Sequence, residues 1–377
     1  MPDDIIMDIL MRLPLRSLCC LRCVSKACLD MVDSPSFTTL HRERLLKMSS
    51  NDYVAAASSE VPQLIQLQYN YPSITWQPLE IDDECRLTQT KYPLHVSKMF
   101  NALDFVFCNL FFFQRNVREY MESINPNSYY LIDPLRREGL RIPHCPTNHK
   151  DLVHQFGMGF DNTTNTYKIV CVSGSLENHH ATTHIYVLGT ESSSWREIWS
   201  VAPRPLSRKN VCAYGDMHWL VEEAGSHVNV AGRSHIISFD FKKEEFCWTP
   251  HPTLKRLRPG FGNSRLLEDL HLLNMKGSMA MVDTNSSKEY IDIWVVKSYL
   301  KKEWTLDYRI NTQALAGYSK GGLRSHSCYE WEHGIAFHNG RMCYFLDLRN
   351  NSIKYMSGRF RSIYSFIGGL LISLKKL

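Results

Sequence analysis

Short runs of strand-forming residues recur along most of this chain at a nearly constant interval, and this repetition limits the folds that the chain can adopt. Asp133, Asp240 and Asp347 each end such a run, and 240 − 133 and 347 − 240 both equal 107. Two further runs, residues 185–188 and 291–295, lie near the midpoints of the two intervals. The repeating unit is therefore about 53 residues long, and most of the chain is expected to be an array of similar units.

Each unit is expected to consist of short strands. From about residue 60 onwards, runs rich in Val, Ile, Tyr, Phe and Trp are separated by Gly, Asn, Ser and Pro, which is typical of all-β domains. A period near 53 residues lies in the range of kelch-like β-propeller blades. Five units are clear and a weaker sixth lies near Asp82, so we expect about six blades. Strands from both ends should complete the last blade, with residues 363–374 supplying one of them. A β-sandwich stack is the alternative.

The first forty residues have a helical pattern instead. Pro2 suits a first helical turn, two aspartates follow it at the positive end of the helix dipole, and Pro14 stops the helix. Ser17 and Ser25 are placed to cap following helices. The apolar residues at helical spacing are Ile5, Ile6, Ile9, Leu10 and Leu13, and then Leu18, Leu21, Cys23, Val24 and Cys28. About forty residues cannot build an independent core, so we expect this segment to dock on a partner. The alternative is a helical cap packed on its own domain.

The helical segment resembles the F-box, whose pattern starts with Leu-Pro-x-Asp and continues through Arg-Leu-Pro and Val-Ser-Lys to Ser-Pro-x-Phe. Met1 stands at the position of the leading Leu, and Cys28 stands where the family usually carries Trp. The residues that follow the pattern are Pro2, Asp4, Ile5, Ile9, Leu10, Arg12, Leu13, Pro14, Ser17, Leu18, Arg22, Cys23, Val24, Ser25, Lys26, Ser34, Pro35 and Phe37. The resemblance implies that this segment binds a Skp-type adaptor protein and, through it, a cullin.

The repeated region resembles the F-box-associated domain that is abundant in plants. Residues 156–161 (FGMGFD), followed by residues 167–170 (YKIV), are similar to the Gly-x-Gly-Tyr-Asp and Tyr-Lys-Val-Val signature of that family. The family's Gly-Ser-x-Asn-Gly-Leu segment is not recognisable around residues 107–113, so the first blade is expected to be degenerate. Gly157 and Gly159 lack the third glycine of a phosphate-binding loop, and we interpret them as a tight turn of a strand. Further matching pieces are residues 132–134, 140–143, 195–196, 215–219 and 236–240.

The two resemblances imply a small all-α F-box over residues 1–48 and an all-β propeller of about six blades over residues 60–377. They imply a non-catalytic subunit of an SCF-type ubiquitin ligase, which recognises the substrate. The F-box would dock on the Skp adaptor, and the propeller would bind an unidentified target protein. The residues expected to bind the adaptor, while packing in part among themselves, are Pro2, Ile5, Ile6, Ile9, Leu10, Leu13, Pro14, Leu18, Leu21 and Val24.

Two alternative functions stay open. The chain could be an adaptor-bound interaction platform without a ligase role, and degradation of a bound partner would separate this reading from the first. It could also be a propeller enzyme or sugar-binding protein whose helical start is only a cap. In either protein-binding reading, aromatic and basic side chains on loops would form the recognition face. Candidates are Arg204, Arg208, Lys209, Arg256, Arg258, Phe261, Tyr318, Arg324 and Tyr329.

Composition argues against several other classes of protein. The chain is 44% hydrophobic and 21% charged, which favours a globular fold. Its net charge is only +5 and its basic residues are scattered, so we expect no nucleic-acid partner. Twelve irregularly spaced cysteines, without a signal-peptide pattern, indicate small hydrophobes in a reducing compartment, the cytoplasm and/or the nucleus. The longest apolar stretch, residues 105–113, is too short to cross a bilayer, so no membrane association is predicted.

Histidines and cysteines give no signature of a metal or catalytic site. Two groups of them are close in sequence: His179, His180 and His184, and then His144, Cys145, His149 and His154. Neither group has metal-ligand spacing on a fixed scaffold. A catalytic cysteine would need a histidine base and an orienting acid, and no local motif supplies them. The sequence therefore predicts no cofactor, no metal and no catalytic residue.

Overall fold

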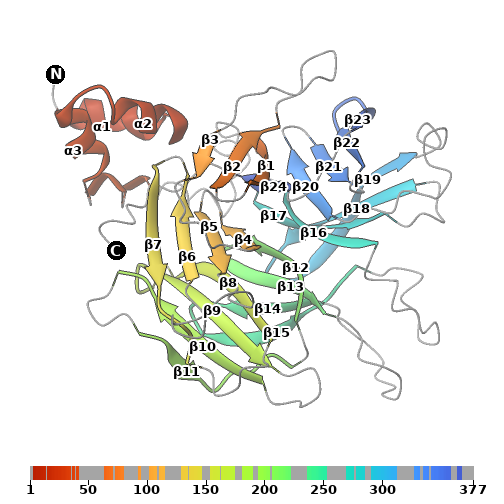
Figure 1. The fold of residues 1–377 in the computed structure, drawn as a ribbon. Coiled ribbons are helices and arrows are strands. Elements are labelled where there is room, and N and C mark those ends of the chain that lie inside the picture. Colours follow the sequence, from red (N-terminus) through yellow and green to blue (C-terminus); the bar gives the residue numbers. More distant parts are fainter. Residues whose placement is uncertain are drawn as a thin grey trace. The chain divides into compact units, whose positions relative to one another are not determined.

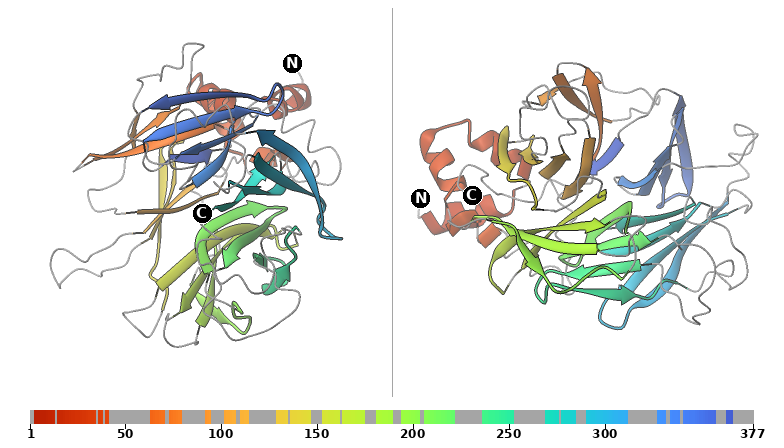
Figure 2. Two further views of the ribbon diagram at one scale, coloured as in Figure 1. Left: turned by 90° about the vertical axis from the view of Figure 1, so that its right-hand side faces the viewer. Right: turned by 60° about the horizontal axis from the view of Figure 1, so that its bottom comes forward.

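The computed structural model divides into two compact units, Met1–His144 together with Ser362–Leu377, and Cys145–Arg361. Figures 1 and 2 show the helices, which belong to the first unit, and the antiparallel sheets, which occur in both units. The structure describes residues 3–13, 15–34, 36–38, 40–41, 63–70, 73–79, 92–94, 102–107, 110–114, 129–134, 136–146, 153–161, 163–174, 181–189, 194–203, 206–221, 236–252, 269–275, 277–284, 290–311, 327–331, 334–338, 341–357 and 363–366.

In the described part of the N-terminal module, residues 3–41, the helices α1 (Asp3–Met11), α2 (Leu15–Leu21) and α3 (Lys26–Val32) surround a small apolar core. Residues 36–38 and 40–41 are also helical. Leu18, Val32 and Phe37 are completely buried at the centre of this core. The predicted cap at Ser25 is confirmed, because its side chain accepts a hydrogen bond from the backbone N–H of Cys28. The cap predicted at Ser17 is wrong, because α2 begins two residues earlier and contains it.

Two four-stranded antiparallel sheets complete the first unit. One has the order β24 (Ile363–Phe366), β1 (Gln63–Asn70), β2 (Ser73–Pro78) and β3 (Tyr92–Leu94). The other has the order β4 (Ala102–Phe107), β5 (Leu110–Gln114), β6 (Tyr129–Asp133) and β7 (Glu138–Ile142). This second sheet has all four strands, so the expectation of a degenerate first blade is wrong.

Strands from both ends of the repeated region meet in one sheet, as predicted. β24 pairs with β1 in antiparallel register, with Gln63 opposite Phe366. Only residues 363–366 of the predicted closing segment lie within the described part of the chain, and they form this strand. The third strand of the sheet, β2, ends just before residues 79–82, where the weaker sixth unit was predicted; Asp82 itself lies outside the described residues.

The second unit contains four sheets, each with its strands in sequence order. They are β8 (Val153–Asp161), β9 (Thr166–Gly174), β10 (Ala181–Val187) and β11 (Arg196–Ile198); β12 (Leu206–Ala213), β13 (Asp216–Val221), β14 (Ile236–Asp240) and β15 (Glu245–Thr249); β16 (Leu270–Met275), β17 (Ser278–Asp283), β18 (Tyr290–Ser298) and β19 (Glu303–Asn311); and β20 (Ser327–Trp331), β21 (Gly334–His338), β22 (Met342–Asp347) and β23 (Ser352–Ser357). The described residues thus form six four-stranded sheets in total, in agreement with the predicted number of about six.

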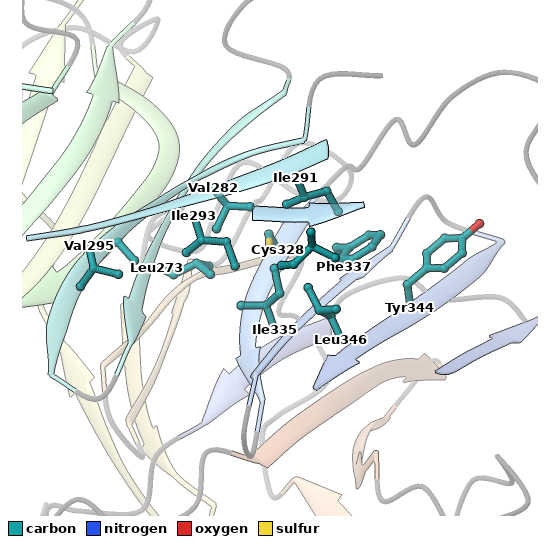
Figure 3. Packing of buried hydrophobic residues seen from close by; sticks show 12 residues of the cluster. Leu273, Val282, Ile291, Ile293, Val295, Cys328, Ile335, Phe337, Tyr344 and Leu346 are labelled. Atoms are coloured by element: carbon teal, nitrogen blue, oxygen red, sulfur yellow. The ribbon is translucent and has the colours of Figure 1, made fainter. Parts of the chain in front are cut away.

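Apolar side chains join successive sheets of the second unit. Figure 3 shows the cluster between the sheets β16–β19 and β20–β23, in which Ile293, Ile335 and Leu346 are completely buried. The first strands of the sheets also contact one another, β12 with β8 and with β16, and β16 with β20. In each sheet the first strand therefore lies toward the neighbouring sheets. Burial of these apolar faces provides the main stabilisation of such a fold.

The aspartates that mark the sequence repeat have one structural role. Asp133, Asp240 and Asp347 each end the third strand of a sheet, and their carboxylates accept hydrogen bonds from the turn that follows. The runs near the midpoints lie in β10 and β18, which are the third strands of the intervening sheets. The 107-residue interval therefore spans two sheets, and an aspartate is favoured because its side chain closes the turn. The donors are the backbone N–H groups of Arg136, Lys242 and Arg349, at 3.1, 2.8 and 2.9 Å.

Gly157 and Gly159 lie inside β8, so their interpretation as a tight turn is wrong. A Cβ atom on Gly157 would lie 2.8 Å from the Trp219 ring, and one on Gly159 would lie 2.1 Å from the Phe241 ring. Trp219 lies on β13, and Phe241 lies in the turn that follows β14, so both rings belong to the neighbouring sheet β12–β15. The two glycines are required because the neighbouring sheet approaches closer than a side chain would permit.

The two short connections of the sheet β4–β7 lie at one end of the sheet, and its long connection lies at the other end. In an up-and-down sheet, the first and third connections lie at one end and the second connection lies at the other. Residues 108–109 and 134–137 form the first and third connections, whereas residues 115–128 form the second. The turn after Asp133 therefore lies at the short-turn end of this sheet.

Candidate functional site

Three of the ten residues predicted to bind an adaptor are apolar and exposed. Ile5 and Ile9 lie one turn apart on α1, and they are 49% and 48% exposed. Val24 lies in the turn that follows α2 and is 69% exposed. Covering apolar surface with a partner is favourable by about 25 cal/mol per Å². These three residues are therefore the strongest candidates for adaptor contacts.

The other predicted residues mainly support the module. Leu18 is completely buried, so its side chain belongs to the core of the module and not to its surface. Ile6 is half-buried on α1. Three leucines are partly buried against the core: Leu10, Leu13 and Leu21. Pro2 and Pro14 lie outside the residues whose side chains are described. The expectation that these residues pack in part among themselves holds for Leu18, and their adaptor contacts stay a prediction.

Four charged residues, which we call the clamp, join the module to the sheet β4–β7. Asp33 follows α3, and its two carboxylate oxygens accept hydrogen bonds from Nη2 of Arg22 and Nη2 of Arg136, each at 2.8 Å. Oε1 of Glu138 lies 3.4 Å from Nη2 of Arg22 and 3.5 Å from Nε of Arg136. Arg22 and Asp33 belong to the module, whereas Arg136 and Glu138 belong to the turn after β6 and the start of β7.

The clamp is buried. The Arg136 side chain has no exposed surface, the Glu138 side chain is 3% exposed, and the Arg22 and Asp33 side chains are each 15% exposed. Burial opposes the positive charge of Arg22, but the hydrogen bond to Asp33 and the negative charge of Asp33 outweigh it, so the pKa of Arg22 is raised. Each cation of the clamp therefore has an anionic partner at a site where an unpaired charge is costly.

Cys19 lies beside the clamp. Burial raises the pKa of its thiol to about 12, and the negative charge of Asp133 at the end of β6 adds to this shift. At neutral pH the group is therefore a protonated, weakly reactive thiol. Cys20 and Cys23 of the same module are exposed, as is Cys247. The cysteines that the structure describes form no disulfide bonds with one another, and Cys145, Cys171, Cys328 and Cys343 are buried, as expected for cysteines that act as small hydrophobes.

The clamp was not found from the sequence. Arg22 was noted only as part of the F-box pattern, and Asp33, Arg136 and Glu138 belong to no motif. Its two cross-connections join residues that are 103 and 116 positions apart. The one available signal was that Arg136 and Glu138 lie within five positions after Asp133, a marker of the repeat. Pairing over such distances cannot be inferred from local spacing.

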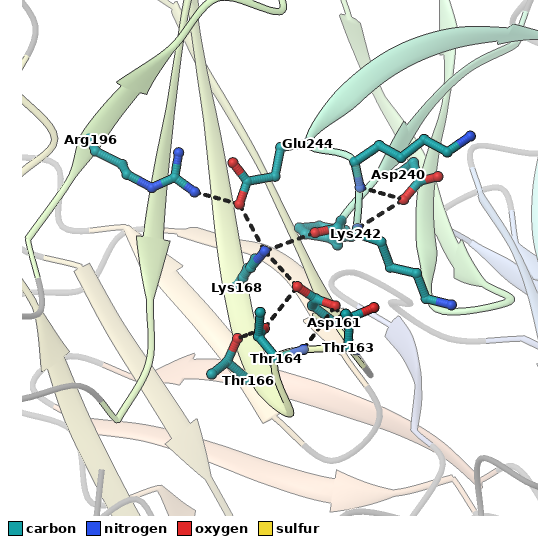
Figure 4. A network of polar contacts seen from close by, with 11 residues as sticks. Asp161, Thr163, Thr164, Thr166, Lys168, Arg196, Asp240, Lys242 and Glu244 are labelled. Carbon is teal, nitrogen blue, oxygen red and sulfur yellow. Dashed lines mark hydrogen bonds and ion pairs between the residues drawn. The ribbon is translucent and has the colours of Figure 1, made fainter.

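A second ion cluster, the Lys168 network, lies in the second unit and consists of Asp161, Lys168, Arg196 and Glu244 (Figure 4). It is buried except for Arg196, whose side chain is 49% exposed. Nζ of Lys168 donates hydrogen bonds to Oδ2 of Asp161 and Oε1 of Glu244, both at 2.8 Å, and to the carbonyl oxygen of Phe241 at 3.0 Å. Glu244 also accepts a hydrogen bond from Arg196. Because Lys168 lies on β9 and Glu244 lies in the turn between β14 and β15, the network joins two neighbouring sheets.

The described residues give no metal site. No group of three or more His, Cys, Asp and Glu side chains among them could hold a metal ion. His154 instead shares a 2.9 Å hydrogen bond with the hydroxyl of Ser173. His149, His179 and His180 lie outside the described residues. In the part of the chain that the structure describes, no helix has the length and apolar character needed to cross a membrane.

Three of the nine candidates for target recognition are described, and all three lie in strands instead of loops. Arg208 and Lys209 belong to β12, and Nζ of Lys209 donates a hydrogen bond to the carbonyl oxygen of Leu270 at 2.9 Å. Tyr329 belongs to β20, and burial raises its pKa to about 12. The loop position predicted for these three residues is therefore wrong. The other six candidates lie outside the described residues.

Comparison with known proteins supports the two resemblances. The family model described as "F-box associated beta propeller domain" matches residues 77–316, and the model described as "F-box domain" matches residues 1–40. F-box protein At3g07870 of Arabidopsis thaliana is 26% identical over 335 residues, covering 83% of this chain and 73% of that protein. F-box protein CPR1 of the same plant is 22% identical, covering 81% and 71%. An oligogalacturonate lyase in complex with manganese has 8% identity and a TM-score of 0.40 over 77% of each chain, which supports no conclusion about activity.

Proposed function

Because this chain belongs to the F-box proteins that carry an F-box-associated β-propeller domain, we propose that it is the substrate-recognition subunit of an SCF-type ubiquitin ligase. The module would dock on a Skp-type adaptor and through it on a cullin, in the cytoplasm and/or the nucleus. The propeller domain would hold a target protein. The chain would act by proximity, since a target held near the charged conjugating enzyme presents its lysines at high effective concentration.

The apolar surface of the module is the observation that best supports this proposal. Ile5, Ile9 and Val24 are exposed although they belong to a small module with few buried side chains. A side chain that served only to cap the propeller would be covered by it. Exposed isoleucine and valine on a short helical module are therefore more consistent with a surface that an adaptor covers.

Co-purification of the full chain with a Skp-type adaptor tests the proposal. Ile9→Asp would place an ionised carboxylate in the apolar contact, and we expect binding to fall by at least about 100-fold. Leu40→Asp is the matched control, because Leu40 is also exposed, at 44%, but lies outside α1 and the turn after α2. Equal binding of the wild-type chain and the Ile9→Asp variant would contradict the proposed adaptor contact.

A second measurement separates a ligase subunit from a passive platform. The adaptor-bound chain is mixed with a cullin, a charged conjugating enzyme and ubiquitin, and ubiquitin transfer to proteins that co-purify with the propeller is followed. We expect transfer that depends on Ile9. Stable adaptor binding without any transfer would favour the interaction platform.

A further inference from the structure

We propose that the clamp fixes the orientation of the F-box module on the sheet β4–β7, so that the exposed adaptor-binding surface has a fixed position relative to this sheet. Arg22 and Asp33 are then positioning residues that bind the chain's own blade, and Arg136 and Glu138 form the receiving surface. The structural part of this inference stands by itself. Its consequence for ubiquitin transfer rests on the proposed function.

The contacts of the clamp alternate in charge across the joint. Asp33 of the module reaches Arg136 of the sheet at 2.8 Å, and Arg22 of the module reaches Glu138 of the sheet at 3.4 Å. Within the module, Arg22 and Asp33 also bind each other at 2.8 Å. Each charge therefore has an opposite charge both on its own side and across the joint. Such a pattern fixes register and excludes displaced arrangements, which would place like charges together.

On both sides of the joint, hydrogen bonds of the backbone N–H groups fix the segments that carry the clamp residues. The Asp33 backbone N–H donates a hydrogen bond to the carbonyl oxygen of Leu29 at 2.9 Å, and that of Arg22 donates to the carbonyl oxygen of Leu18 at 3.1 Å. On the sheet, the Arg136 backbone N–H donates to the Asp133 carboxylate at 3.1 Å. The four charged groups therefore stand on rigid supports, which lowers the entropy lost when the joint forms.

The clamp and the adaptor candidates are separate sets of residues with opposite exposure. Val24 lies two positions after Arg22 and is 69% exposed, whereas the Arg22 side chain is only 15% exposed. Ile5 and Ile9 on α1 make no part of the clamp. The module can therefore bind an adaptor while the clamp stays closed. The module would thus bind the chain's own sheet through a polar surface and the adaptor through an apolar surface.

The clamp also sets which end of the sheet the module occupies. Arg136 lies in the turn after Asp133, at the short-turn end of the sheet β4–β7. The long connection of residues 115–128 leaves the opposite end.

Cys19 provides a built-in reporter of the clamp. Burial, with a contribution from Asp133, holds the pKa of its thiol near 12. Opening of the joint removes Asp133 and admits water, so the thiolate fraction rises and alkylation becomes faster. The experiment measures alkylation of each cysteine by iodoacetamide in the full folded chain at pH 8, resolved by fragment-ion mass spectrometry. The variants are Asp33→Asn and Glu138→Gln, one on each side of the joint and both nearly isosteric.

We expect alkylation of Cys19 to be about tenfold or more faster in both variants than in the wild-type chain. Asp30→Asn is the matched control, since Asp30 is an exposed aspartate on α3, and it should leave the rate unchanged. Cys20 and Cys23 are exposed and should react at one rate in every variant. Cys343 is buried in the second unit and should stay unlabelled, which shows that the variants remain folded. Unchanged labelling of Cys19 in both clamp variants would overturn the proposal.

A second readout keeps this inference distinct from the proposed function. Adaptor binding of Asp33→Asn and Glu138→Gln should stay within about threefold of wild type, because the adaptor candidates are untouched. In the reconstituted ligase, the set of the chain's own lysines that receive ubiquitin should broaden when the clamp is open. If the wild-type chain binds no adaptor, the proposed function fails while the Cys19 measurement still decides on the clamp. A clamp variant that labels fast and loses the adaptor would show that the clamp residues belong to the adaptor surface, and would contradict the separation argued above.

Discussion

The clamp and the Lys168 network are both buried ion clusters, but they stabilise joints of different kinds. The Lys168 network joins two sheets that also share a large apolar cluster, which includes Val170, Trp219 and Phe239. The apolar cluster of the N-terminal module, by contrast, contains only residues of the module among those that the structure describes. The charges of the Lys168 network therefore add to a joint that packing already defines, whereas the clamp charges define theirs. We conclude that the sheet-to-sheet joint is robust and that the module-to-sheet joint is sensitive to charge.

Removing the cation of the Lys168 network should have the largest effect on stability. Lys168→Met leaves Asp161 and Glu244 buried around a neutral side chain, although Glu244 keeps its ion pair with Arg196. Breaking a buried ion pair on one side typically costs about 3–5 kcal/mol, so we expect the free energy of unfolding to fall by about that amount. Chemical denaturation of the full chain measures this change.

Lys297→Met is the matched control for that substitution. Lys297 also pairs with a carboxylate, that of Asp307, but its side chain is 53% exposed. Its loss should cost less than about 1 kcal/mol. If both substitutions lowered the free energy of unfolding by similar amounts, burial would not make the Lys168 network more important for stability than an exposed ion pair. The contrast between the two joints would then be unsupported.

The second prediction concerns the packing that accompanies the Lys168 network. Gly159→Ala would place a Cβ atom 2.1 Å from the Phe241 ring and 2.7 Å from the carbonyl oxygen of Gly215. Phe241 must then move, and its own carbonyl oxygen accepts a hydrogen bond from Lys168. Overpacking of this kind costs about 1–3 kcal/mol, measured as a lower free energy of unfolding.

Gly139→Ala is the control for backbone flexibility. Gly139 lies on β7 beside the clamp, and the nearest atoms to an added Cβ would be 3.9 Å away. This substitution should be neutral or slightly stabilising, because it only restricts the unfolded chain. An equal loss of stability in both variants would show that close approach of the sheets is not the reason for glycine at position 159.

The repeat and both domains could be predicted from the sequence because their signals are local and periodic. Asp133, Asp240 and Asp347 close equivalent turns, so one turn chemistry recurs at a fixed interval. One prediction failed and one feature was missed where the cause lies far away in the sequence. Gly157 and Gly159 are glycines because the neighbouring sheet packs closely on their strand, and not because they form a tight turn. The clamp pairs residues that are more than a hundred positions apart. Long-range packing and charge pairing leave no periodic trace in a single sequence.

A double-mutant cycle at the clamp gives the third prediction. Asp33→Asn, Arg136→Met and the double variant should show a coupling free energy of about 1–2 kcal/mol between these two residues. If the stability losses of the two single variants add up to the loss of the double variant, the ion pair across the joint contributes nothing to stability. The exposed pair of Asp8 on α1 and Arg12 directly after it, whose side chains are 63% and 67% exposed, is the matched comparison. Its coupling should be only about 0.3–0.5 kcal/mol.

The last prediction concerns a partly buried carboxylate that forms no ion pair within the described part of the chain. Asp216 accepts a hydrogen bond from the Tyr299 hydroxyl at 2.7 Å, and burial raises the pKa of Asp216 to about 6. In the Lys168 network, burial also opposes ionisation of Asp161, but hydrogen bonds from Lys168 and Thr164 outweigh it and hold the pKa of Asp161 well below its ordinary range. The two carboxylates therefore make stability depend on pH with opposite signs.

The pH dependence of Asp216→Asn separates the two cases. The folded chain favours protonated Asp216, so its contribution to stability is complete below about pH 4 and is lost as the pH rises to about 6. The Asp216→Asn variant should therefore gain stability relative to wild type across this interval and keep a constant difference above it. Asp161→Asn should behave in the opposite way, with a loss that is complete above about pH 4 and shrinks as the pH falls below it. Denaturation at a series of pH values measures both differences. Parallel curves for the two variants would mean that a cation partner does not decide the sign, and the distinction between paired and unpaired buried carboxylates would fail for this protein.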